Sequence, residues 1–388
     1  MPDHYEQTVE LQGVTWDHSR GYTSIVAVSQ RFEELNPGIR IRWEKRSLSE
    51  FESEPIDRLA RHYDLLIIDH PWAGFAVRHD ILLNLNELLD KRFLSGQARN
   101  SVGTSFESYS FNGFQSALPI DAASPVAVWR PDLLKEGGVP RTFEETMAMA
   151  REGKVIYAAQ PTYLLMDFLS LCVTLGGTPF APVHEERLVE RQVAERALDD
   201  MHALANSCDP IVFTLNPISL CELLASSNKF QFCPAVYGYV NYSRRGYAPH
   251  PLKAGPIIKY CGKPLRGVLG GTGIAISAGC EHRSTSARFL EYVMSGKVQR
   301  TLYCDSGGQP GHRSAWRDPE CNRQTLDFFQ DTLPTLDNAY LRPRYSGYLT
   351  FQDSAGKVLF EFVRGSFSKE HAIQELNRLF AESTKIGG

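Results

Sequence analysis

The stretch that decides the fold is LQGVTWDHSRGYTSIVAVSQRFEELNPGIRIRW, residues 11–43. It opens with a short strand candidate, Leu11–Thr15, and a polar turn at 16–21 follows. Apolar residues then recur every three or four positions up to Leu35, which is the period of an amphipathic helix. Asn36-Pro37-Gly38 ends that helix, and residues 39–43 alternate between apolar and charged as a half-exposed strand does. Strand, helix and strand in this order predict a parallel sheet with right-handed crossovers.

The alternation of strands and helices continues outward along the chain. Leu65–Ile68 is a continuous apolar run, typical of a parallel strand covered on both faces. Residues 274–276 are another strand candidate, after a glycine-rich break. The second half repeats this style, and amphipathic helices are expected at Leu164–Leu175, Val193–Ala205, Ser284–Met294 and His371–Phe380. The pattern as a whole predicts an α/β fold.

Two polar, aromatic turns stand where such a sheet would bind a ligand. One spans Trp16–Gly21 after the first strand, and the other spans Asp69–Trp72 after the third. Ligands of open α/β sheets bind beyond the carboxyl ends of the strands, so we expect both turns to line one crevice. The alternative is a structural role, as a helix cap and as a strand-end turn shaped by proline. The ligand-binding candidates in the two turns are Trp16, Asp17, His18, Arg20, Asp69, His70 and Trp72.

Composition and missing motifs exclude several classes of function. A net charge of -4 and a pI of about 6.3 argue against a general nucleic-acid binder. None of the eight cysteines forms a Cys-x-x-Cys pair, which argues against a zinc ribbon and favours reduced, mostly buried thiols. The sequence contains no P-loop, dinucleotide-binding, nucleophile-elbow or His-Glu-x-x-His motif. We therefore expect no cofactor and no metal.

The sequence shows no signal for a membrane or for export. Its most apolar segment, Tyr163–Leu175, is interrupted by Asp167 and is far shorter than the roughly 20 residues of a transmembrane helix. Met1–Gln7 has neither the basic nor the apolar region of a signal peptide. We expect a cytoplasmic protein as the sequence stands, and a periplasmic one if the native start was trimmed.

Short segments spread over the chain share the order of a known family. Gly137-Gly138-Val139-Pro140 leads into a helix, and Gly307-Gly308-Gln309-Pro310 forms a turn near the end. In these segments the chain resembles the extracellular solute-binding proteins of family 1, the maltose-binding-protein type that serves carbohydrate ABC transporters. The other segments that carry the resemblance are 32–39, 63–66, 81–89, 117–119, 129–134, 141–145, 270–277, 287–296 and 365–379.

The resemblance implies a type II periplasmic-binding-protein-like fold, with two α/β lobes and a ligand cleft and hinge between them. The hinge would lie near Pro119–Asp121 and Lys263–Gly267. Lobe 1 would comprise residues 1–118 and 267–313, and lobe 2 would comprise residues 119–266 and 314–388.

The remaining ligand-binding candidates are Asp121, Tyr237, Tyr239, Gly270, Gly271 and Gln309. By the resemblance, the tyrosine rings would stack on a sugar face. The aspartate would accept hydrogen bonds from hydroxyls, and the glycines would let backbone amides approach the ligand. The structural alternatives are core aromatics, a hinge residue bonded to the backbone, and plain turns.

The first hypothesis is a solute-binding protein that closes on a small polar ligand, namely a carbohydrate, a sugar acid or a related small acid. Arg20 would pair with a ligand carboxylate or phosphate, while Asp17 and Asp69 would accept hydroxyl hydrogen bonds. We expect a monomer without nucleic acid, and an ABC permease as partner if the protein is exported.

The second hypothesis is a cytoplasmic lyase, isomerase or hydrolase on the same fold. It rests on the missing export signal and on two Asp-His pairs at strand ends. His18 or His70 would act as general base, and Asp17, Asp69 or Asp121 would act as the acid. A third, lower-ranked hypothesis is a cytosolic sensor that passes ligand occupancy to a partner protein.

Overall fold

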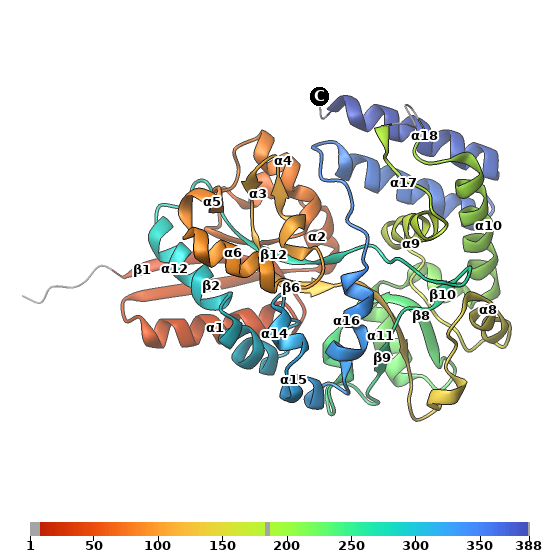
Figure 1. Cartoon of the computed structure of the whole chain (residues 1–388), viewed down its shortest axis with the longest axis horizontal. Helices are drawn as coiled ribbons and strands as arrows, with labels where there is room; N and C mark the ends of the chain where they lie inside the picture. The colour runs from red at the N-terminus through yellow and green to blue at the C-terminus, as the bar shows by residue number, and fades with distance from the viewer. Residues whose placement is uncertain (1–7, 183–186, 387–388) are drawn as a thin grey trace, which may run out of the picture. The chain divides into compact units, whose positions relative to one another are not determined.

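The computed structural model describes residues 8–182 and 187–386 (Figure 1). Met1–Gln7, on which the expectation about export rests, lie outside the described residues.

The chain divides into two compact units and changes from one to the other three times. The chain passes from one unit to the other after residues 122, 269 and 321, whereas lobe borders were expected at 118, 266 and 313. The location of the hinge stays a prediction. Unit 1 comprises Met1–Ala122 and Gly270–Cys321, and unit 2 comprises Ala123–Leu269 and Asn322–Gly388.

Unit 1 is built on a five-stranded sheet. The strand β1 (Val9–Trp16) pairs in parallel with β2 (Ile39–Arg46) and with β3 (Leu65–Ile68). Buried and exposed residues largely alternate along β2, whereas all four residues of β3 are buried, so both sequence-based strand predictions are confirmed. The order across the sheet is β2-β1-β3-β12-β6, with β12 at Gly270–Ile276 and β6 at Leu118–Ala123.

The sheet is mixed rather than wholly parallel, which corrects the prediction from the sequence. The strand β12 runs antiparallel to β3, with Gly273 opposite Ile68 and Ile276 opposite Leu65. An apolar run such as 274–276 predicts a strand but carries no information about its direction. The chain enters this strand from unit 2 rather than through a βαβ crossover.

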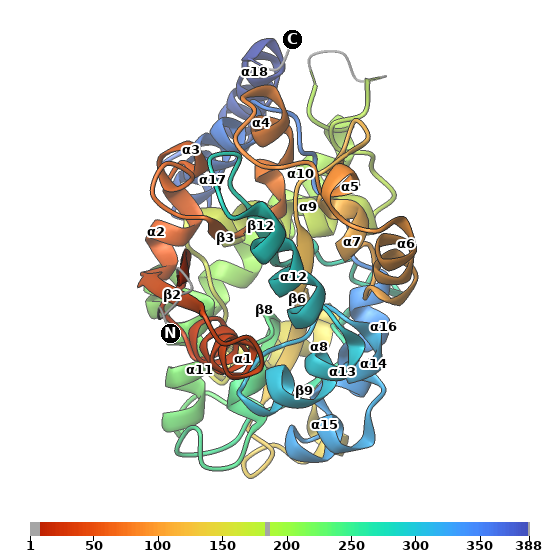
Figure 2. The same ribbon diagram turned by 90° about the vertical axis from the view of Figure 1, so that its left-hand side faces the viewer.

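The helix α1 (Tyr22–Leu35) covers part of this sheet with one apolar face. Ile25, Val28 and Phe32 are buried, as the spacing predicts. The Phe32 ring meets Phe289 of α12 (Arg283–Val293) edge-on at 5.3 Å, so α1 and α12 lie side by side (Figure 2).

The remaining elements that begin in unit 1 are short. They are α2 (Leu48–Ser53), α3 (Ile56–Leu59), η1 (His70–Trp72), α4 (Ala73–Arg78), α5 (Leu85–Leu88), α6 (Lys91–Asn100), α7 (Ser105–Ser108), β4 (Ser110–Phe111), β5 (Phe114–Gln115), α13 (Gly296–Val298), η6 (Gln299–Tyr303), α14 (Arg313–Trp316) and α15 (Pro319–Gln324).

Unit 2 combines a small antiparallel sheet with a helical layer. Its central strand is β7 (Pro125–Trp129), which lies between β8 (Phe232–Tyr237) and β9 (Lys253–Gly255). The parallel strand–helix style expected for the second half is therefore absent from this three-stranded sheet, whose hydrogen-bonded pairs are all antiparallel.

The long helices of unit 2 pack on one another (Figure 1). They are α9 (Pro161–Thr174), α10 (Arg191–Ser207), α17 (Tyr348–Val363) and α18 (Lys369–Ile386), and three of them confirm helices predicted from the sequence. The other elements are η2 (Glu136–Gly138), α8 (Phe143–Arg151), η4 (Pro210–Thr214), α11 (Pro217–Ser226), η5 (Val240–Ser243), β10 (Lys259–Tyr260), β11 (Lys263–Pro264) and α16 (Phe328–Asp337).

Candidate functional site

The two predicted ligand turns lie at one edge of the unit 1 sheet. The strands β1 and β3 are parallel neighbours, so their carboxyl ends meet at the same edge. The first turn joins Trp16 at the end of β1 to Tyr22 at the start of α1. The second turn begins at Asp69 directly after β3 and continues into η1. Both turns thus lie at one edge of the sheet, and the expectation that they line one crevice stays a prediction.

The first turn places one aromatic residue in the core and one carboxylate on the surface. Trp16 is buried and packs against Phe51 with ring centroids 5.4 Å apart. A Cβ atom on Gly21 would lie 2.5 Å from the Trp16 ring, so glycine is needed there. Asp17 is exposed, and its carboxylate accepts a hydrogen bond from Lys45 Nζ at 2.8 Å. Of Trp16 and Asp17, therefore, only Asp17 exposes its side chain to solvent.

Arg20 and Asp121 form a buried ion pair within unit 1. Arg20 Nε donates to Asp121 Oδ2 at 2.8 Å, and Arg20 Nη2 donates to Asp121 Oδ1, so the contact is bidentate. Burial raises the pKa of Asp121, while the charge and hydrogen bonds of Arg20 act in the opposite direction. Two guanidinium donors are thus already used inside the protein, and the pair joins the β1–α1 turn to β6.

His18 is a buried, neutral imidazole. Its Nδ1 accepts a hydrogen bond from the backbone N–H of Arg20 at 3.0 Å. Burial, followed by the nearby Arg20 cation, lowers the pKa of His18 to about 3. At neutral pH this ring therefore carries no charge, and it is a much weaker base than an ordinary histidine.

The second turn is organised around Asp69. Its carboxylate accepts the backbone N–H of His70 at 2.8 Å and lies 3.1 Å from His70 Nδ1. His70 is fully buried and meets Tyr109 edge-on at 6.2 Å, while Trp72 is buried and meets Phe75 edge-on at 5.4 Å. Asp69, with 27% of its side chain exposed, is the most accessible of the three predicted residues.

The glycines and the glutamine lie close to β6 and β12. Gly270 and Gly271 begin β12, and Gly271 has a φ of 98°, which a side chain rarely tolerates. Gln309 is buried, and its Nε2 donates to the carbonyl of Ala122 at 2.8 Å. The backbone N–H of Ala122 returns a bond to the Gln309 carbonyl at 3.1 Å. Gln309 thus secures the end of β6, and the ligand contacts expected from these residues stay predictions.

In unit 2, the predicted tyrosines lie at and after the end of β8. Tyr237 is half-buried and stands opposite Pro125, the first residue of β7. Tyr239 is buried, and Tyr242 donates its hydroxyl to Glu222 at 2.8 Å inside the unit. Tyr237 is therefore the most accessible of these three rings.

A hollow beside Tyr237 is lined by two further residues that were not predicted from the sequence to bind a ligand. Tyr163 and Asp167 of α9 line it together with Tyr237, Pro125 and Pro217, and its volume is about 10 Å³. The two α9 residues are four positions apart, so they share a helix face. The available signal was Asp167 itself, a carboxylate inside the most apolar segment of the chain.

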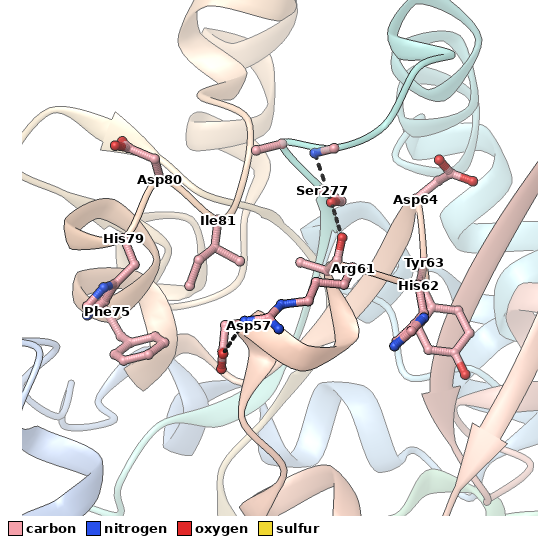
Figure 3. Close-up of a pocket in the computed structure, with 13 residues that line it drawn as sticks. Asp57, Arg61, His62, Tyr63, Asp64, Phe75, His79, Asp80, Ile81 and Ser277 are labelled. Carbon is pink, nitrogen blue, oxygen red and sulfur yellow. Dashed lines mark hydrogen bonds and ion pairs between the residues drawn. The ribbon is translucent and has the colours of Figure 1, made fainter.

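Another hollow of unit 1 lies at the opposite edge of the sheet (Figure 3). It has a volume of about 740 Å³ and includes Asp64, just before β3, and Ser277, just after β12. Some of its charged side chains have local partners: Asp64 accepts the N–H of Gln12 at 2.9 Å, and Arg61 lies 3.7 Å from Asp57. None of the ligand-binding residues predicted from the sequence lines this hollow.

The described residues contain no group of three or more histidine, cysteine or acidic side chains able to hold a metal ion. None of the described helices is long and apolar enough to cross a membrane. No disulfide joins any of the eight cysteines, most of which are buried, as expected from the sequence.

Solved structures match nearly the whole chain, although no family model matches it. Maltose-bound MalE3 of T. maritima superposes with a TM-score of 0.82 at 19% identity, covering 97% of this chain and 100% of that chain. An ABC transporter solute-binding protein from Agrobacterium radiobacter K84, in complex with ribitol, gives 0.80 at 18% identity, covering 97% and 98%. One from Thermotoga lettingae TMO, bound with α-D-tagatose, gives 0.81 at 14% identity, covering 97% and 99%.

Likeness at such low identity establishes the fold, and the order of elements agrees with the resemblance found in the sequence. This chain therefore has the type II periplasmic-binding-protein fold, in the form found in maltose-binding-protein-like solute-binding proteins of ABC transporters.

Proposed function

We propose that this chain is a solute-binding protein that closes on one small polar molecule, a carbohydrate, a sugar acid or a related small acid. The observation that carries the proposal is the likeness over 97% of the chain to solute-binding proteins whose structures hold maltose, ribitol or α-D-tagatose. A permease of the ABC type is the partner that this proposal implies.

Each unit offers groups suited to such a ligand. In unit 1, Asp17 and Asp69 are the accessible carboxylates at the edge where β1 and β3 end. In unit 2, Tyr237 and Tyr163 line one hollow, and tyrosine combines a flat apolar face with a hydroxyl. Carboxylates that accept hydroxyl hydrogen bonds and rings that stack on a sugar are the pattern expected for a polyol ligand.

The internal contacts favour binding over acid–base catalysis. A histidine with a pKa of about 3 is poorly matched to general-base work at neutral pH. Arg20 and Asp121 pair with each other, which gives them a positioning role at the edge of the sheet. The chain passes between the units at 122–123, 269–270 and 321–322, and we expect closure around a ligand as a hinge motion near Pro119–Asp121 and Lys263–Gly267.

The test is native mass spectrometry of the purified chain with a pool of sugars, polyols, sugar acids and small acids, followed by calorimetry on any ligand found. We expect one persistent adduct, with the free compounds left intact. Tyr237→Ala should weaken binding on the order of tenfold through loss of stacking. Tyr242→Phe, which alters a tyrosine bonded inside unit 2, serves as the matched control. Depletion of one compound with appearance of a new mass would instead identify an enzyme.

A further inference from the structure

Asp167 lies where two hollows of unit 2 meet. The outer hollow is the one beside Tyr237, and the inner one, of about 40 Å³, is lined mainly by apolar side chains such as Leu171 and Met201. Asp167 and Ala235 line both. A volume of about 10 Å³ admits a single group the size of a water molecule, so the outer hollow fits the tip of a ligand rather than its body.

The carboxyl group of Asp167 has no partner among the described residues. Neither a hydrogen bond nor an ion pair joins it to any of them, and burial alone raises its pKa well above the usual range. Asp200, the other carboxylate lining the inner hollow, is satisfied: Arg196 Nε donates to it at 2.7 Å and the Tyr260 hydroxyl at 2.5 Å. The two carboxylates therefore differ in compensation, although they line the same hollow.

Asp167 is partly buried, so its carboxylate loses part of its hydrating water without gaining a partner among the described residues, and this costs folding free energy. Residues that destabilise the empty protein are often those that a ligand needs.

We propose that the solute carries a protonated amine, and that its ammonium group enters the outer hollow and pairs with Asp167. The inference rests on the proposed solute-binding function and narrows its ligand class to amino sugars and other polar amines. Tyr163 and Tyr237 line the same hollow, and aromatic faces beside a carboxylate attract a cation. A water-sized opening suits the primary ammonium group, which supplies three donors.

The first experiment measures affinity for matched pairs that differ only in one group, such as D-glucosamine with D-glucose and D-galactosamine with D-galactose. Calorimetry should show the better-bound amine exceeding its hydroxyl counterpart by roughly 10- to 100-fold, the range of a charge-assisted hydrogen bond. Asp167→Asn should abolish that preference. The affinity for the amine should also rise from pH 5 to pH 7, because the cation pairs with the ionised carboxylate.

A hydroxyl member bound as tightly as its amine, or a preference that survives in Asp167→Asn, would overturn the inference while leaving the proposed function intact. Failure of every neutral and aminated compound, in this series and in the wider pool, would remove the proposed function and the inference together.

The second experiment needs no ligand. Asp167→Asn should raise the melting temperature at pH 7, because the substitution removes an uncompensated acid. The gain should shrink toward pH 4, where the unfolded chain also holds the proton. Asp200→Asn is the matched control and should lower the melting temperature, since it breaks contacts with Arg196 and Tyr260. A loss of stability in Asp167→Asn equal to that in Asp200→Asn would show that Asp167 has a structural partner, and would overturn the inference.

Discussion

Arg20 and Asp121 are 101 positions apart in the chain, yet each satisfies the other inside unit 1. Removing one partner of a buried pair leaves an uncompensated charge, which costs about 3–5 kcal/mol. We expect Arg20→Met to lower the free energy of unfolding by this amount, as measured by urea denaturation. The double variant Arg20→Met/Asp121→Leu should recover most of the loss, because no unpaired charge remains. Equal losses in the single and double variants would contradict a dominant role for the ion pair.

His18 gives the stability of the protein a defined dependence on pH. Its pKa in the folded protein is about 3, below the usual 6.5. Between these two pH values the imidazole is protonated in the unfolded chain but not in the folded protein. Stability should therefore fall as pH drops from 7 to 5, by up to about 1.4 kcal/mol per pH unit below 6.5.

Urea unfolding of His18→Gln at pH 7, 6 and 5 should show a shallower dependence on pH than the wild-type protein. His62→Gln, at an exposed position, is the control and should keep the wild-type slope. Parallel slopes for wild type and His18→Gln would mean that the buried imidazole is protonated in the folded state.

Two helical glycines should respond to alanine in opposite directions. Gly96 in α6 has open space around it, so Gly96→Ala should stabilise the protein by up to about 1 kcal/mol through helix propensity. Gly356 in α17 faces α9, where a Cβ atom would lie 2.6 Å from the Pro161 carbonyl oxygen. Gly356→Ala should therefore cost about 1–3 kcal/mol through overpacking. Thermal unfolding of both variants tests this, and a stabilised Gly356→Ala would show that the two helices separate easily.

The elements that the sequence predicts well are those defined by local periodicity. The β1–α1–β2 stretch and β3 follow directly from the spacing of apolar residues over fewer than fifteen positions each. The direction of β12 could not be predicted from local periodicity. It depends on the path of the preceding segment, which belongs to unit 2. The antiparallel sheet of unit 2 was missed for the same reason, since strand pairing is a long-range property.

The candidate site shows the same limit at the level of the whole molecule. The sequence predicted that the two turns lie at the same edge of the unit 1 sheet, because the ends of strands can be located from local patterns. It could not show that Arg20 pairs with Asp121, which lies 101 positions further along the chain, and the ligand contact expected of Arg20 stays a prediction. It gave Asp167 no role, because a single acid in an apolar run reveals its surroundings only after the hollows around it have formed.

The number of thiols that react in the native protein tests the fold as a whole, because the eight cysteines differ in exposure. Cys261 is exposed, whereas the others are buried or half-buried, and burial raises the pKa of Cys208 to about 12. One thiol per chain should react rapidly with dithionitrobenzoate under native conditions, and all eight should react in denaturant. Cys261→Ser should remove the rapid phase. A second rapid thiol in the native protein would show that a buried cysteine is accessible.

The place of β12 in its sheet has a consequence for how the protein is made. This strand stands between β3 and β6, but it is translated about 150 residues after β6. During synthesis, the strands up to residue 123 therefore leave the ribosome before β12 exists, and their sheet has a gap between β3 and β6. Most of unit 2 is synthesised before β12 can fill this gap. During this interval the edges of β3 and β6 are open to incorrect pairing, the situation in which nascent chains depend on chaperones. Separate expression of residues 1–122 would leave the same gap permanently unfilled.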